Sequence, residues 1–296
     1  MKAACTLDDF IKLMEEDRGL VIEDKNRVRG ILFDCNYYRL SGYFRVFQKD
    51  PVNGNNSFKA NTRFDDFYTP YYKDEKLRAL ILGGISLFEI TLRSRFAYLS
   101  AHAQGPEGYL YANNYNESFR KGLNGDQNIK LLKEIKDWIK KSDEVCIHHF
   151  KRRNEAIPVW TAVEVLPFGV ISKILSLYRD RDVLAQLYSS LGLRKFKFTA
   201  QSIHAMVYLR NICAHHSRLW YKEMSVSPTV PKMILARFGA LKNSYSPKSV
   251  WQSLLMLMYF VDTIRRDQEF SRGVIGLAES SEVYLAGLKH PLHWKE

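Results

Sequence analysis

The chain has 296 residues, enough for one large domain or two small ones, and hydrophobic residues make up 46% of it, as in a globular protein. Its 44 basic and 32 acidic residues give a net charge of +12, which attracts nucleic acid or anionic membrane, although solubility alone is the simpler explanation. Four scattered cysteines without CxxC pairs argue against a disulfide framework or zinc ribbon, and no secretory signal or run of ~20 apolar residues is visible, so we expect a cytoplasmic protein.

Helical periodicity begins near the start of the chain. Thr6 can cap a first helix that ends near Gly19, and apolar positions within 28–35 predict a second helix. The stretch Y-Y-R-L-S-G-Y at 37–43 is predicted to break at Gly42. These segments belong to a predicted N-terminal helical extension, residues 1–60.

The sequence P-V-N-G-N-N-S at 51–57 predicts a turn, because Pro, Gly and Asn are the residues that turns require. The aromatic and β-branched residues around it could form two short strands: Phe44, Val46 and Phe47 before the turn and Phe58 after it.

The longest periodic segment, residues 74–101, predicts a central helix. Other helices are predicted at about 131–139, 158–167, 168–179, 182–191, 199–216 and 247–267. There is no internal repeat and no low-complexity linker. We therefore predict an all-α, mainly helical fold in which residues 61–296 form one domain, continuous with the extension or separate from it.

The segment L-R-N-I-C-A-H-H-S-R-L-W at 209–220 places polar groups among core-forming residues. On an ideal helix Arg210 shares the apolar stripe of Ile203 and Met206, so its guanidinium is predicted to point inward. His215 lies about 140° away from Arg210 around the helix axis. The two can act together if the helix ends near His215, or if two copies of the segment meet in a symmetric homodimer.

Arginine and histidine together suit phosphoryl chemistry on RNA without a metal or another cofactor. Histidine, with an unperturbed pKa of about 6.5, exchanges protons near neutral pH, and arginine holds a phosphate and its developing charge. We therefore assign Arg210 and His215 as catalytic candidates, with Asn211 orienting a phosphate oxygen. His216 and Arg218 are candidates for a second proton carrier and a backbone contact.

The run R-N-I-C-A-H-H-S-R-L-W resembles the R-N-x-x-A-H-H-x-R-L-W segment of Abi-type abortive-infection proteins, the AbiD/AbiF group of bacterial phage-resistance factors. Other segments agree with that group in the same order and extend the resemblance over residues 5–231: Y-Y-R-L-S-G-Y at 37–43, L-F-E-I-T-L-R-S at 87–94, G-P-E-G-Y-L at 105–110 and V-W-T-A-V-E-V-L-P-F-G at 159–169. Five ordered segments are far more specific than one short motif.

The resemblance implies a HEPN-like helical bundle with an R-x4-6-H motif, which marks metal-independent ribonucleases that act as dimers. Carried onto this chain, the motif is Arg210, Asn211 and His215. It also implies attack of the RNA 2′-hydroxyl on the adjacent phosphate, leaving a 2′,3′-cyclic phosphate. The chain departs from the family after Trp220, where Tyr221 and Lys222 replace the usual Asn-Arg, and this puts the substrate contacts beyond the motif in question.

Three further residues are predicted to support the site. Glu89 and Arg93 are spaced i, i+4 and either form a structural ion pair or serve the site, as their presence in a family segment favours. Glu89 or Glu164 could supply the carboxylate that orients Arg210.

The predicted RNA contacts lie in two groups. Rings next to arginine could stack on bases, although core packing is the alternative for the tyrosines; this group comprises Tyr37, Tyr38, Arg39 and Tyr43. Basic runs could contact phosphates or form a solvated face: Lys151, Arg152 and Arg153, with Arg194, Lys195 and Lys197. The similar pairs His148-His149 and His215-His216 suggest zinc only weakly, because adjacent histidines on a helix diverge.

The sequence thus predicts a defence or toxin endoribonuclease that acts on RNA, works as a homodimer and is silenced by an RNA or protein antitoxin. The alternative is a non-catalytic RNA-binding or partner-binding module of the same helical fold, in which Arg210 closes a structural ion pair. A membrane-acting toxin is disfavoured by the lack of a spanning segment.

Overall fold

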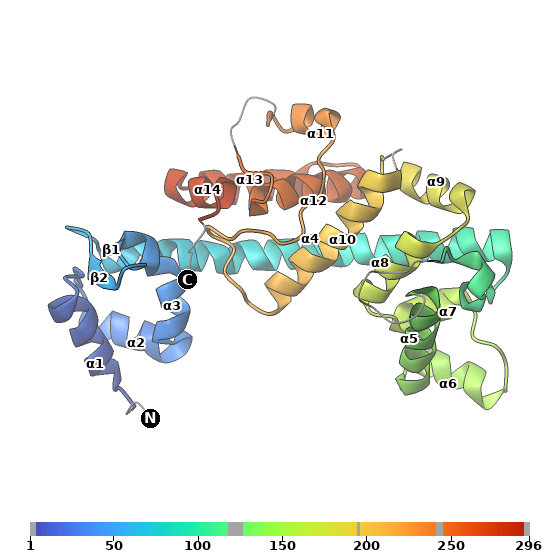
Figure 1. Ribbon diagram of the computed structural model, residues 1–296, viewed down its shortest axis with the longest axis horizontal. Helices are drawn as coiled ribbons and strands as arrows, with labels where there is room; N and C mark the ends of the chain where they lie inside the picture. The colour runs from blue at the N-terminus through green and yellow to red at the C-terminus, as the bar shows by residue number, and fades with distance from the viewer. Residues whose placement is uncertain (1–3, 118–126, 194–195, 241–244, 293–296) are drawn as a thin grey trace.

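A computed structural model of the chain describes residues 4–117, 127–193, 196–240 and 245–292, and it confirms a mainly helical fold. One helix, α4 (Phe64–Gln104), runs the length of the molecule, with all other elements arranged along it (Figure 1). At 1.5 Å per residue its 41 residues span about 60 Å. Among the described residues, no helix is both long enough and apolar enough to cross a bilayer.

Helix α4 begins ten residues before the predicted start at residue 74 and passes through Pro70 without ending. Proline removes one helical hydrogen bond, so the first turns need other support. Phe67 provides it, because its fully buried ring packs against those of Phe44 and Phe58 at centroid distances of 5.5 and 6.2 Å. The aromatic core thus extends the helix beyond its periodic part.

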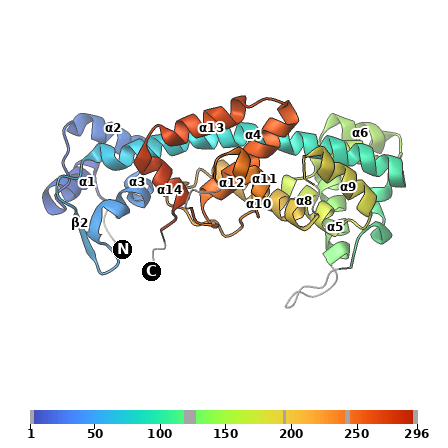
Figure 2. The same ribbon diagram turned by 90° about the horizontal axis from the view of Figure 1, so that it is seen from above.

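The N-terminal elements cover one end of α4 (Figure 2). Thr6 caps the first helix as predicted, and the elements here are α1 (Leu7–Lys12), its π-helical continuation Leu13–Asp17, α2 (Lys25–Cys35) and α3 (Tyr37–Phe44). The predicted break at Gly42 is wrong. It falls at Asn36, which has φ +62 and accepts a hydrogen bond from the Tyr38 amide, so that α3 starts afresh there.

The predicted hairpin is present but shifted along the chain. It consists of β1 (Gln48–Asp50) and β2 (Asn55–Phe58), which pair antiparallel with Gln48 opposite Phe58. Phe44 instead ends α3, and Val46 and Phe47 lie in the 3₁₀ turn Arg45–Phe47. The domain boundary at residue 60 stays a prediction.

The other end of α4 carries a group of shorter helices: α5 (Gln127–Lys141), α6 (Val145–Arg152), α7 (Val159–Val165), α8 (Phe168–Leu177) and α9 (Arg181–Ser190). Pro158 and Pro167 stand at the N-caps of α7 and α8, so they delimit α7 as predicted. Helix α6 was not predicted, because its basic run hides a short apolar face centred on buried Ile147.

The middle of α4 is covered by α10 (Phe196–Ala214), α12 (Val250–Arg265) and α13 (Glu269–Glu279). Helix α11 (Lys232–Arg237) packs on α12, and α14 (Glu282–Lys289) packs on α12 and α13. Almost every residue of α12 up to Asp262 is buried, and Phe260 stacks on Phe88 of α4 at 4.6 Å. Helices α11, α13 and α14 were missed from the sequence, where short length and glycines obscure their periodicity.

Candidate functional site

Helix α10 ends at Ala214, two residues before the predicted end, in a Schellman motif. The Ser217 amide donates to the Ile212 carbonyl and the His216 amide to the Cys213 carbonyl, each at 3.0 Å, while His216 adopts φ +53. His215 and His216 therefore leave the helix in a turn, and both are exposed. The helix ends near His215, which is one of the two arrangements that the sequence requires for joint action with Arg210.

Arg210 is exposed, so the prediction that its guanidinium points into the core is wrong. The side chain lines a cavity of about 400 Å³ between α4, α7 and α10. Its Nη1 donates to Oδ1 of Asn211 at 3.2 Å, and it forms no ion pair within 4.0 Å of any described residue. The apolar stripe of α10 does face α4, but at this point the neighbouring surface is hollow and open to water.

The same cavity brings together the three predicted supporting residues, Glu89, Arg93 and Glu164. Arg93 forms an ion pair with Glu89, and the two side chains are only 11% and 15% exposed. The Arg93 guanidinium also donates to the carbonyls of Val163 and Glu164, in the last turn of α7. Arg93 thus has a structural role, since its hydrogen bonds join α7 to α4, and the ion pair also forms one wall of the cavity that Arg210 lines.

Asp74 is the important residue that sequence reasoning missed. Its fully buried carboxylate accepts hydrogen bonds from the amides of Leu219 (2.7 Å) and Trp220 (3.1 Å) and from the hydroxyls of Tyr43 and Tyr284, both at 2.7 Å. Burial raises the pKa of Asp74, against the effect of these four hydrogen bonds. The available signal was an acid on the same helical stripe as Leu77 and Ile81, where a charge needs partners.

Helices α3 and α4 hold the turn that follows α10 through arginine side chains. Arg39 Nη2 donates to the His216 carbonyl at 2.8 Å, and Arg78 Nη1 donates to the Ser217 carbonyl at 3.3 Å. In the opposite direction Arg218 donates to the Gly42 carbonyl, and burial lowers the pKa of this arginine. The family segments at 37–43 and 209–220 therefore contact each other directly.

The predicted stacking tyrosines differ in exposure. Tyr37 and Tyr43 are 8% and 2% exposed, and their rings lie against Phe10 and Trp220 respectively. The prediction of base stacking is therefore corrected for these two, because enclosed rings have no free face, and core packing describes them. Tyr38 is 72% exposed, and its role in base stacking stays a prediction.

The predicted basic run lies on and just after α6, at the end of the molecule away from α14 (Figure 1). Lys151 donates to the carbonyls of Lys140 (3.0 Å), in the last turn of α5, and of Ser142 (3.4 Å), just after that helix, and Arg153 pairs with Glu155 at 3.2 Å. Arg152 is exposed. Arg194 and Lys195 lie outside the described residues, as does the Lys197 side chain.

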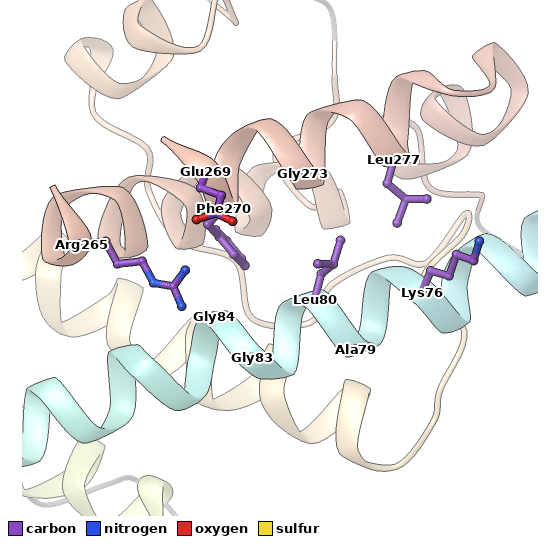
Figure 3. Close-up of a pocket in the computed structure, with 10 residues that line it drawn as sticks. All are labelled: Lys76, Ala79, Leu80, Gly83, Gly84, Arg265, Glu269, Phe270, Gly273 and Leu277. Carbon is purple, nitrogen blue, oxygen red and sulfur yellow. The ribbon is translucent and has the colours of Figure 1, made fainter. Parts of the chain in front are cut away.

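A second hollow, of about 760 Å³, lies between α4 and α13 (Figure 3). Its walls are mostly apolar or glycine, and the Phe270 ring packs so closely on Gly84 that an added Cβ would lie 2.4 Å away. None of the predicted site residues lines it. The polar cavity beside Arg210 is therefore the candidate site.

A family model described as Abi-like protein matches residues 30–221, which is more than half of the chain. No curated protein and no solved structure matches it. The matched range contains Arg39, the cavity residues, the histidine turn and Asp74. The chain belongs to the Abi-like protein family, and this membership points to abortive infection, a form of phage defence.

Proposed function

We propose that this protein is a metal-independent endoribonuclease of bacterial anti-phage defence, built on a HEPN-like helical domain. The observation that carries the proposal is the end of α10. There Arg210 and Asn211 are exposed beside a polar cavity, and His215 and His216 follow in an exposed turn. A group that must exchange protons with a substrate has to be reachable in this way.

The distribution of charge supports a polyanionic substrate. Between Val183 and Val261 the only acidic residue is Glu223. The same stretch contains these basic residues: Arg194, Lys195, Lys197, Arg210, Arg218, Lys222, Lys232, Arg237, Lys242 and Lys248. Most of the net positive charge of the chain therefore belongs to the segment that contains α10, and RNA phosphates are attracted to such a segment.

In the proposed reaction an imidazole of the turn removes the proton from a ribose 2′-hydroxyl, and the 2′-oxygen attacks the adjacent phosphorus. The bond from phosphorus to the 5′-oxygen breaks, and a second, protonated imidazole gives that oxygen its proton. The products are a 2′,3′-cyclic phosphate and a 5′-hydroxyl. Arg210 holds the non-bridging oxygens and stabilises their growing charge, with Asn211 beside it. His215 and His216 supply the imidazoles.

The unpaired state of Arg210 favours this function over a non-catalytic module. That alternative requires Arg210 to close a structural ion pair, and among the described residues it forms none. A solvated guanidinium at the mouth of a cavity is free to take a phosphate. Glu89 and Glu164 line the same cavity and would repel a misplaced phosphate, which helps to fix the register of the substrate.

Two partner relationships belong to the proposal. A homodimer is the second arrangement that would let Arg210 and His215 act together, because it would bring another copy of the motif to the site. Light scattering tests this, and a strict monomer that cleaves RNA would contradict a shared site. An RNA or protein antitoxin would keep the enzyme silent. Expression without neighbouring genes tests that, and harmless accumulation of active enzyme would count against a silencer.

The deciding experiment is cleavage of total RNA by the purified protein in EDTA. Arg210→Ala and His215→Ala should each reduce cleavage by about 10²-fold or more, as expected for loss of a catalytic group. Matched controls are His204→Ala, an exposed histidine on α10, and Arg265→Ala, which lines the hollow between α4 and α13. Cleavage that requires a metal, or that survives both site substitutions, would reject the proposal.

A further inference from the structure

The side chains of the histidine turn make few contacts, yet most residues from His216 to Trp220 have a backbone group that is hydrogen-bonded to a side chain of another helix. The carbonyls of His216 and Ser217 accept from Arg39 and Arg78, and the amides of Leu219 and Trp220 donate to Asp74. All of these partners come from α3 or α4, far away in sequence. The proposed reaction uses none of them.

We propose that Asp74 is a positioning residue of this site: its buried carboxylate fixes residues 217–220 and thereby sets the direction in which the His215–His216 turn faces. The inference rests on the proposed function for its catalytic consequence. Its structural part rests only on the contacts of the carboxylate.

The division of the hydrogen bonds between the two carboxylate oxygens supports this role. Oδ2 accepts both backbone amides together with the Tyr43 hydroxyl, while Oδ1 accepts the Tyr284 hydroxyl alone. Tyr43 belongs to α3 and Tyr284 to α14. The two tyrosines therefore hold the carboxylate from opposite ends of the chain, so that Oδ2 is directed at the two amides.

Stability alone does not explain a buried acid here. Burying a carboxylate costs free energy, and well-packed apolar residues often stabilise a core as well as buried charges do. A carboxylate does provide something that an apolar side chain lacks, namely a directional acceptor for two neighbouring amides that lie beyond the helix end. That directional role is needed where a displacement of about 1 Å can cost 10²-fold in rate.

Trp220 connects the backbone held by Asp74 to α14. Its indole Nε1 donates to the Val283 carbonyl at 3.2 Å, and its ring lies so close to Gly287 that a Cβ there would be 2.1 Å from Nε1. The Tyr221 amide donates to the Gly287 carbonyl at 2.9 Å. Helix α14, outside the matched range 30–221, is thus part of the scaffold behind the turn.

The test uses three conservative variants of the full chain, Tyr43→Phe, Tyr284→Phe and Asp74→Asn, and compares the last of them with Asp74→Ala. The two tyrosine changes each remove one hydroxyl from the carboxylate. Asparagine keeps one oxygen, which can still accept from the two amides while its Nδ2 donates to the Tyr284 hydroxyl. The control is Tyr109→Phe, a buried tyrosine at the other end of α4 whose hydroxyl donates to the Ile157 carbonyl.

Two readouts are needed, hydrogen–deuterium exchange of the 215–221 peptide and the split between kcat and KM for RNA cleavage. We expect faster exchange in Tyr43→Phe and Tyr284→Phe, and a kcat that falls by about 10-fold or more with little change in KM. Asp74→Asn should retain more activity than Asp74→Ala, and Tyr109→Phe should match the wild type in both readouts.

The outcomes separate the inference from the proposed function. If the wild type cleaves RNA and both tyrosine variants, still folded, keep wild-type exchange and kcat, the positioning role is overturned and the ribonuclease stands. If the wild type does not cleave RNA but exchange at 215–221 rises in both variants, the proposed ribonuclease function is rejected, whereas the role of Asp74 in fixing the turn is supported.

Discussion

The segment 209–220 contains two regions of opposite character. Arg210, Asn211 and the two histidines are exposed and make few contacts. Leu219 and Trp220, only a few residues later, are fully buried, and both of their amides bond to Asp74. One short sequence thus holds the reactive groups and the anchor that supports them.

The difference explains why polar and core-forming residues are mixed there. Groups that meet a substrate must be open to solvent, but they work only when their backbone is fixed by a rigid support. Substitutions in the buried region should therefore cost stability, and those in the exposed region should cost activity alone. Trp220→Ala and the pair Arg210→Ala and His215→Ala test that separation directly.

The largest effect is expected from Trp220→Ala. Trp220 is fully buried, stacks on Tyr43 and Phe47, and donates to the Val283 carbonyl. Truncation leaves a cavity and should lower the free energy of unfolding by about 3–5 kcal/mol, measured by urea denaturation. Trp160→Ala, at a position 53% exposed, is the matched control and should change it by about 0.5 kcal/mol or less. Equal losses in the two variants would contradict the anchor.

Arg210→Ala and His215→Ala should show the reverse pattern. Cleavage falls by about 10²-fold or more, as above, whereas the free energy of unfolding stays within about 0.5 kcal/mol of the wild type, because both side chains are exposed. Thermal melts recorded beside the cleavage assays check this. A large loss of stability in Arg210→Ala would place that residue with the anchor instead.

Arg93→Lys should have an intermediate effect on stability. Lysine keeps the charge next to Glu89 but loses the planar fork that also reaches the Val163 and Glu164 carbonyls. We expect a loss of about 1–3 kcal/mol in urea denaturation, typical of hydrogen bonds to charged groups. An unchanged stability would mean that the contact between α7 and α4 does not depend on this arginine.

The pH dependence of Asp74 gives a smaller effect. Burial raises its pKa in the folded state above the ordinary value of 3.8, so the carboxyl group of Asp74 binds a proton more tightly in the folded than in the unfolded chain. Its contribution to stability is thus fully present below 3.8 and declines as the pH rises through the folded pKa. The unfolding free energy of the wild type minus that of Asp74→Asn should therefore fall from acidic to neutral pH. A difference that rises with pH would show that the four hydrogen bonds and the buried guanidinium of Arg78, whose Nη1 lies 4.0 Å from Oδ2 of Asp74, together outweigh burial.

The smallest effect concerns the thiols. Cys213 lies between Arg210 and His215 in sequence but is fully buried, and burial raises its pKa to about 12. Exposed Cys5 and Cys146 should react quickly with a thiol reagent at neutral pH, whereas Cys213 should react only on unfolding. Mass spectrometry of the labelled peptides identifies the sites. Rapid labelling of Cys213 would show that the end of α10 opens readily.

The sequence predicts what depends on local pattern. The caps at Thr6 and Pro158 and most of the long helices follow from spacing and from residues with fixed conformational preferences. The break was predicted at Gly42, because glycine commonly interrupts helices. The structure has the break at Asn36, whose side chain caps the new helix. The length of α4 depends on aromatic contacts of Phe67, which come from other elements and cannot be seen in periodicity.

The sequence predicted which residues line the cavity better than it predicted how their side chains are directed. Glu89, Arg93, Glu164 and Arg210 do meet around one cavity. The direction of Arg210 was predicted from its own helix alone, and that information does not reveal a hollow in the facing helix. Asp74 was missed because its hydrogen-bond partners, Tyr43, Leu219 and Tyr284, lie 31, 145 and 210 residues away in sequence.

Helix α4 carries both the anchor, at Asp74, and the cavity wall, at Glu89 and Arg93. Fifteen residues of unbroken helix hold Asp74 and Glu89 about 22 Å apart along the axis and in a fixed angular phase. Inserting one residue between them would turn Glu89 by about 100° relative to Asp74. The length of the helix thus fixes the distance between the anchor and the cavity. We therefore expect an insertion or deletion in α4 to reduce stability and activity more than a substitution of any exposed residue of that helix.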